Sequence, residues 1–248
     1  MVGNNLSTRS ITKHVIGDST AAKSDQYTQV TFGAQNFSHN IVTLTQKSGE
    51  DNTVVKTESI GTPLADFSRY NSIETNRKNS AGQIPDFSNI EGGWGKSSDQ
   101  TNAQYLSQAM FGVIPFANLN AAERARIFKL IKDSKVYSPA FDKVVIQNED
   151  YIYSVELNPV PYLKLLAELS RVTGVASLVD ANVDDYKDSP PLKLTISVDK
   201  RSRQLKKVKY DSGGQEETYE SHGLNAGVQI PDKTIPMNEL ETRVANIQ

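Results

Sequence analysis

The most regular pattern in the chain lies in its last quarter, where apolar residues occupy every second position from 192 to 198. This period of two is typical of a strand with one buried face. Residues 211–214 tolerate the positive φ angles of a tight reversal, and Pro231 marks a strand end. The region therefore predicts a meander of four strands, over residues 192–198, 204–210, 215–222 and 224–230.

Strand patterns also fill the first third of the chain. They predict strands over residues 27–32, 37–46, 53–60 and 67–75. The turn residues 48–52 join the second and third of these into a hairpin. Residues 144–146 and 151–157 predict another hairpin, in which Tyr151, Tyr153, Val155 and Leu157 share an apolar face. Residues 1–26 are polar and weakly patterned, so we expect an N-terminal polar segment before a single domain over 27–248.

Helical patterns follow the first group of strands, the strand at 151–157 and the final meander. The spacing of apolar residues predicts helices over 101–111, 120–135, 162–173 and 237–246. Asn120 and Glu123 form a capping-box pattern at the start of the second helix, and Gly174 is a natural cap after the third. Helices gathered between groups of hairpin-joined strands indicate an α+β fold: an antiparallel sheet with helices on one face.

Composition narrows the function classes. The 248 residues carry a formal net charge of −2, so no basic field indicates a nucleic-acid partner. The absence of cysteine excludes disulfides, thiol nucleophiles and cysteine metal sites. No apolar run approaches the roughly 18 residues of a membrane helix, and the first residues lack a signal-peptide pattern. The absence of both patterns fits a cytosolic protein and also an ectodomain without its leader. The abundance of Asn, Ser, Thr, Gln and Tyr favours the ectodomain.

The sequence contains no catalytic constellation. His14, His39 and His222 are isolated from one another, and no nucleophile elbow, phosphate loop or zinc-protease motif is present. The acidic run at 180–188 resembles a calcium loop but has Asp185 where that loop needs glycine and Pro191 in place of its glutamate, which favours a solvated loop. We therefore expect a protein that is not an enzyme and has no cofactor.

Two other features have both a structural and a functional interpretation. Trp94, the only tryptophan, is flanked by glycines, so its ring either packs on the core or lines a ligand cavity. The basic hairpin at 200–209 is either a solvated, aggregation-resistant edge or a surface for anionic lipid head groups.

The second half of the chain resembles the lipoprotein-localisation carriers of the LolA/LppX/LprG type. The resemblance rests on the strand at 151–157, the leucine-rich helix after it, and the meander from 192 to 232. Arg69 and Trp94 also fall where the family has strands with an arginine and a tryptophan. The family's lipidated cysteine is absent. The resemblance implies a curved half-barrel sheet, helices in its concave face, an apolar cavity for acyl chains and an extracytoplasmic location reached by a signal or anchor.

Two functions remain as expectations. In the first, the protein carries or senses a lipid or lipoprotein acyl chain and contacts the membrane surface peripherally. In the second, it is an interaction or scaffold ectodomain with a filled core and no small ligand. For the first function we expect the cavity lining to include Trp94, Met110, Phe111, Ile127, Ile131, Tyr153, Leu163 and Leu166.

Overall fold

The structure is a computed structural model that describes residues 5–16, 20–33, 35–97, 104–175, 182–222 and 228–247. Five long strands form the first third of the chain: β1 (Asn5–Ile16), β2 (Thr20–Thr31), β3 (Phe37–Ser48), β4 (Asp51–Gly61) and β5 (Asp66–Thr75). The remaining strands are β6 (Gly95–Ser97), β7 (Tyr137–Pro139), β8 (Val145–Gln147), β9 (Asp150–Leu157), β10 (Leu192–Asp199), β11 (Leu205–Tyr210), β12 (Gln215–His222) and β13 (Ile235–Pro236).

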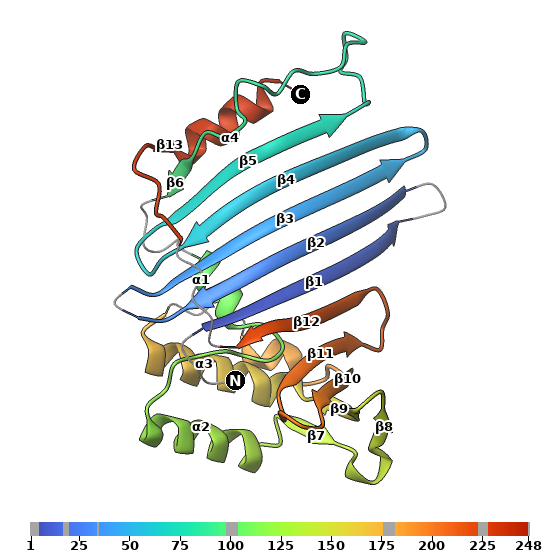
Figure 1. Cartoon of the computed structure of the whole chain (residues 1–248), viewed down its shortest axis with the longest axis vertical. Coiled ribbons are helices and arrows are strands. Elements are labelled where there is room, and N and C mark those ends of the chain that lie inside the picture. The colour runs from blue at the N-terminus through green and yellow to red at the C-terminus, as the bar shows by residue number, and fades with distance from the viewer. Residues whose placement is uncertain are drawn as a thin grey trace.

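All thirteen strands of the described ranges belong to one sheet (Figure 1). Its order is β13-β6-β5-β4-β3-β2-β1-β12-β11-β10-β9-β7, and β8 pairs with β9 outside this path. The β13–β6 pair is parallel and the other strand pairs are antiparallel. The mainly antiparallel sheet that the sequence predicts is therefore confirmed. β1 pairs with β12, so strands from the two ends of the chain meet in the middle of the sheet.

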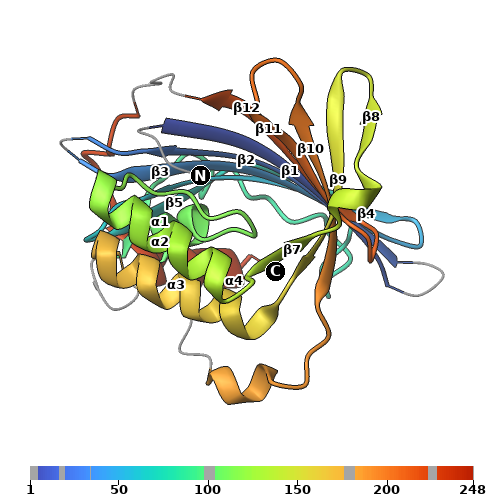
Figure 2. The same ribbon diagram turned by 90° about the horizontal axis from the view of Figure 1, so that it is seen from below.

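Four α-helices accompany the sheet in the described part of the chain: α1 (Tyr105–Met110), α2 (Ala121–Asp133), α3 (Pro159–Thr173) and α4 (Met237–Ala245). Figure 2 shows α1, α2 and α3 on one side of the sheet, which we call the helix-facing side; the opposite side is the outer side. Leu240 of α4 packs with Phe87 and Ile90 beside the β6 edge. None of the described helices combines the length and apolar composition needed to cross a bilayer.

The main core lies between the helix-facing side and the helices. Its sheet residues come from both ends of the chain, because β1 and β2 lie beside β12 to β9. Buried members from the strands are Leu6, Val30, Val155, Leu157, Leu194, Val208 and Tyr219. Buried members from the helices are Leu106, Met110, Ile127, Leu165, Leu166 and Leu169. The apolar residues that alternate at 153–157 and 192–196 thus face the core beneath the helices.

The helix boundaries agree closely with their sequence signals. Asn120 accepts a hydrogen bond from the Glu123 N–H, and the Glu123 carboxylate accepts one from the Asn120 N–H, which completes the predicted capping box of α2. Gly174 ends α3 with a φ of 68°, as a left-handed cap requires. In the β10–β11 hairpin, Arg203 takes a φ of 60°, a conformation that glycine adopts more readily.

Two expectations about strands need correction. Residues 1–26 are not a separate polar segment, because β1 and the first part of β2 lie at the centre of the sheet. The pattern of β1 was hard to recognise because polar Thr8 occupies a buried position on it. The strand predicted over 224–230 is not found: residues 223–227 lie outside the described ranges, and 228–230 are not in a strand.

The short helix α1 is held to the sheet by hydrogen bonds at its start and by close contact between its backbone and β4. The Asp66 carboxylate of β5 accepts hydrogen bonds from the backbone N–H groups of Gln104 and Tyr105, at 2.6 Å and 3.1 Å. A Cβ atom on Gly61 would lie 2.3 Å from the Leu106 nitrogen. Glycine is therefore required at position 61 for the helix to rest on β4.

We predict that Gly61→Ala destabilises the protein by about 1–3 kcal/mol, the usual cost of overpacking. The backbone of α1 cannot rotate away from the added methyl group as a flexible side chain would. Gly33→Ala is the control, since a Cβ there meets nothing within 4 Å. Urea denaturation of both variants measures the difference, and equal free energies of unfolding would contradict the close approach.

Candidate functional site

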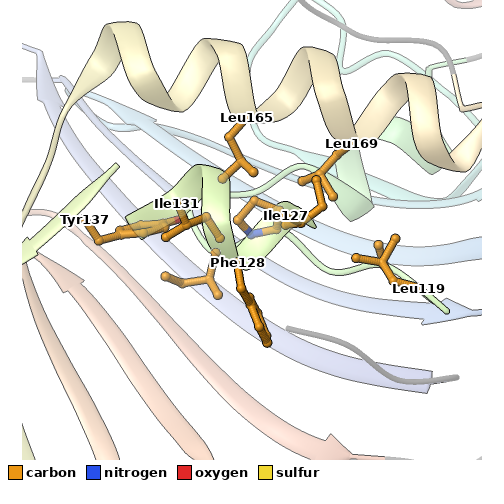
Figure 3. A pocket seen from close by; sticks show the side chains of 10 residues that line it. Leu119, Ile127, Phe128, Ile131, Tyr137, Leu165 and Leu169 are labelled. Atoms are coloured by element: carbon orange, nitrogen blue, oxygen red, sulfur yellow. The ribbon is translucent and has the colours of Figure 1, made fainter. Parts of the chain in front are cut away.

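An apolar cavity lies where α2 and α3 meet the segment that follows α1 (Figure 3). Its volume is about 80 Å³. Leu165 and Leu169 point from α3 toward Ile127 and Ile131 of α2. Phe128 borders the cavity while 54% of its surface stays exposed, so one wall reaches solvent. The full lining is Ile114, Pro115, Ala117, Leu119, Ile127, Phe128, Ile131, Tyr137, Leu165 and Leu169.

Most of the eight residues predicted to line a cavity lie in or against the main core. Met110, Phe111, Ile127 and Leu166 are buried there. Ile131 and Tyr153 are partly buried and pack against it, and Leu163 is partly buried on α3. Ile127 and Ile131 are the two that line the cavity described above. The structure thus brings six of these residues, all except Leu163 and Trp94, into or against the core between sheet and helices.

Trp94, the eighth residue, lies elsewhere. It packs with Ile60, Phe67 and Val228 in a separate cluster on the outer side of the sheet. The guanidinium of Arg69 lies over its ring, 4.7 Å from the centroid. The ring is therefore one wall of an outer-side groove and does not contact the helix-facing cavity.

The outer-side groove has a polar floor built by cross-strand pairs. Its volume is about 570 Å³, and residues 228–232 form one border. Glu58 accepts a hydrogen bond from the Arg69 Nε at 3.0 Å and bonds His39 Nε2 at 2.8 Å. Burial raises the pKa of the Glu58 carboxyl, but its bonds to Arg69 and His39 outweigh burial and hold that pKa below its usual range. The charges in this floor are therefore largely paired with one another.

One partly buried carboxyl beside the core, that of Glu217, was not expected from the sequence. Glu217 and Tyr219 lie two positions apart on β12 and so face the same way. The Tyr219 hydroxyl donates a 2.9 Å hydrogen bond to the Glu217 carboxylate. Burial raises the pKa of Glu217, and it raises the pKa of the nearby Tyr210 to about 12. The period-two phase with buried Tyr219 was the signal that places this carboxyl inside.

Tyrosine hydroxyls in the same layer satisfy the irregular segment after α1. Tyr137 donates to the carbonyl of Val113 at 2.7 Å, and Tyr162 donates to that of Gly112 at 2.6 Å. Burial raises the pKa of both tyrosines. They act as neutral donors that hold the wall of the cavity in place.

In the part of the chain that the structure describes, neither the acidic run nor the basic hairpin shows a metal-binding cluster. No cluster of three or more His, Asp or Glu suited to a metal occurs among the described residues. Residues 180 and 181 of the acidic run lie outside the described ranges, and Asp184 pairs with Lys187 at the surface. In the basic hairpin, Arg201 pairs with Glu149 and Lys206 with Asp150.

Comparison with known proteins gives no relative: no family model, curated protein or solved structure matches this chain. A functional assignment therefore depends on the arrangement of its own side chains.

We predict that Glu217→Gln stabilises the protein at neutral pH. A carboxyl with a raised folded-state pKa favours folding below its unfolded pKa of about 4.5, and this contribution is lost as pH rises through the folded value. Glutamine keeps the acceptor for Tyr219 without the charge. We expect a melting temperature about 2–4 °C higher at pH 7.5, the shift that 1 kcal/mol produces at this size, and no difference at pH 4.

Glu220→Gln is the matched control, because Glu220 lies on the same strand and is exposed. Its melting temperature should match that of the wild type across the pH range. A Glu217→Gln variant that gains nothing at pH 7.5 would show that the Glu217 carboxyl is not desolvated.

Proposed function

We propose that this protein is a non-catalytic carrier that binds a lipid or lipoprotein acyl chain between its sheet and its helices. In this proposal the sheet acts as a half-barrel, and its helix-facing side is the concave face. The observation that carries the proposal is the cavity under α2, whose lining is apolar apart from the Tyr137 hydroxyl. That hydroxyl already donates to Val113, so no polar group there needs a partner from the ligand.

The acyl chain needs more room than the closed cavity offers. Small-molecule sites usually enclose about 300–1,000 Å³, against about 80 Å³ here. We infer that α2 moves away from α3 when a chain enters. Ile127 is the one fully buried residue of α2, and elements with few buried contacts are the ones that open most easily.

The energetics permit useful affinity. An acyl chain gains roughly 0.8 kcal/mol for each buried methylene. About ten methylenes would therefore supply on the order of 8 kcal/mol before the costs of ordering and of moving α2. Micromolar binding needs about 8 kcal/mol in total. An acyl chain a few methylenes longer would offset the free energy needed to move α2, without any charged contact.

Contact with a membrane surface would bring the carrier to its ligand. Of the eight large hydrophobic residues exposed in the described part of the chain, three fall within six positions: Phe141, Val145 and Ile146. The β8–β9 turn beside them meets the basic hairpin, since the Lys200 N–H donates to the Glu149 carbonyl. Apolar side chains beside cations suit an anionic bilayer surface. We extend the proposal to an extracytoplasmic location, which a signal or anchor encoded in the full-length gene would support.

A scaffold or interaction ectodomain with a filled core is the second candidate. The small volume of the cavity favours it, because protein interiors normally pack without large voids. The two functions differ in whether a hydrophobic probe enters the protein.

We predict that the wild type takes up a fluorescent fatty acid and that Ile131→Trp reduces this uptake at least about tenfold. An indole at position 131 would fill the cavity from α2 and remove the space for the chain. Lys129→Trp is the control, since the same side chain on the exposed face of α2 leaves the cavity empty. Fluorescence titration measures uptake, and circular dichroism checks the fold. A wild type without uptake would remove the carrier function and leave the scaffold.

We predict that serine at Phe141, Val145 and Ile146 together lowers binding to phosphatidylglycerol vesicles at least about fivefold, because each loses apolar area that the bilayer would bury. Serine at the exposed Leu64 and Ile84 is the control. Vesicle co-flotation measures binding. Equal flotation of both variants and the wild type would show that the β8–β9 region is not the contact.

A further inference from the structure

A second pocket lies on the helix-facing side, between α1 and strands β2 to β5. Its volume is about 330 Å³, which is within the usual range for small-molecule sites. The lining residues are Gln26, Asn40, Val42, Thr57, Ser59, Ser68, Tyr70, Tyr105, Gln108 and Ala109. We call it the α1 pocket.

The strand register assembles the floor of the α1 pocket. Asn40 of β3 lies opposite Ser59 of β4, and Ser59 lies opposite Ser68 of β5. Two residues further along β4, Thr57 lies opposite Tyr70. These rows place hydroxyl and amide groups side by side on three neighbouring strands. The other part of the helix-facing side, under α2 and α3, is instead lined by apolar residues.

All ten lining residues are uncharged, and eight of them carry a hydroxyl or an amide. The carboxylates of Asp66 and Glu241 act electrostatically on Tyr105, and that of Glu241 also acts on Tyr70, but neither residue lines the pocket. Asp66 is occupied by the N–H groups at the start of α1. An anionic group entering the pocket would find no cation among the lining residues to offset its desolvation.

One acceptor in the α1 pocket lacks a donor. Asn40 is 7% exposed, and its Oδ1 is buried without a hydrogen-bond partner. A buried acceptor of this kind costs free energy unless a ligand or water donates to it. The hydroxyl of a ligand would supply that donor, while Gln26, Gln108 and the serines offer both donors and acceptors.

We propose that the α1 pocket binds an uncharged polyhydroxyl group, such as the sugar or glycerol head group of a neutral lipid. Hydroxyls of the ligand form hydrogen bonds with the amides and hydroxyls of the strands. The apolar face of the ligand, formed by its C–H groups, lies against the rings of Tyr70 and Tyr105. The head-group role rests on the proposed function, since the acyl chain would continue toward the apolar layer. The pocket itself does not need that function to bind a free polyol.

The test compares amphiphiles that share a ten-carbon chain, each used below its micelle concentration. Decyl glucoside and monodecanoylglycerol carry neutral polyhydroxyl heads, decanoate is anionic and decyltrimethylammonium is cationic. Titration calorimetry should show at least one neutral ligand binding ten times more tightly than both charged ones. The stronger of the two neutral ligands identifies sugar or glycerol as the source. Equal or tighter binding of a charged ligand would overturn the proposal.

Ser68→Leu and Ser72→Leu form the matched pair of variants. Both serines lie on β5 and are partly buried, but Ser68 lines the α1 pocket while Ser72 does not. Ser68→Leu should abolish the preference for neutral heads, and Ser72→Leu should keep it. Gln108→Trp is a second variant, for use if Ser68→Leu does not fold. Gln108 is exposed on α1 and lines the pocket, so an indole there should block the pocket without disturbing the core. A preference that survives Gln108→Trp would overturn the assignment.

Free glucose and glycerol separate this proposal from the carrier function. Each is titrated into the wild type while the side-chain amide resonances of Asn40 and Gln108 are monitored by NMR. Shifts of both amide resonances in the wild type support the α1 pocket even if no amphiphile binds. In Gln108→Trp only the Asn40 amide remains, and its resonance should not shift. No shift at millimolar polyol, together with equal affinity for neutral and charged amphiphiles, contradicts it.

Discussion

The pairing of β1 with β12 is the constraint on which the architecture depends. Without it the two groups of strands would be separate sheets, and the main core, which draws on both groups, would be divided. α1 and α2 lie between the two groups in the sequence and α3 follows β9, and in the closed sheet all three lie on one side (Figure 2). The main core is the result: Leu6 and Val30 from the first strands lie in the same cluster as Val208 and Tyr219 from the last.

Local signals predicted most elements of this fold. The capping box at Asn120 and the left-handed Gly174 place α2 and α3 almost to the residue, since caps depend on a few neighbouring side chains. β1 could not be predicted in this way. Its inward positions include Thr8, which is buried because β12 and β2 flank it, and that neighbourhood is a long-range property.

The residues of the candidate sites also divide into those that local sequence patterns could place and those that depend on long-range strand pairing. Six of the residues predicted to line a cavity lie in or against the core between sheet and helices, because they come from segments whose apolar residues face that core. Trp94 has no such context, and its place on the outer side results from the pairing of β6 with β5. The α1 pocket was invisible in the sequence, since serines, threonines and amides on strands usually indicate a solvated face. The short helix above them, held by Asp66, encloses this polar surface.

The meeting of β1 with β12 also sets an order of events during synthesis. Leu6 pairs with His222, so the second edge of β1 stays open until residues 215–222 have been made. Until then β1 is the open end of the β1–β5 meander, and open strand edges are where chains associate wrongly. Polar residues on both faces of β1, among them Arg9 and Thr8, would keep that waiting edge soluble. The same polarity that made β1 hard to recognise in the sequence thus suits a strand whose edge stays open until β12 is made.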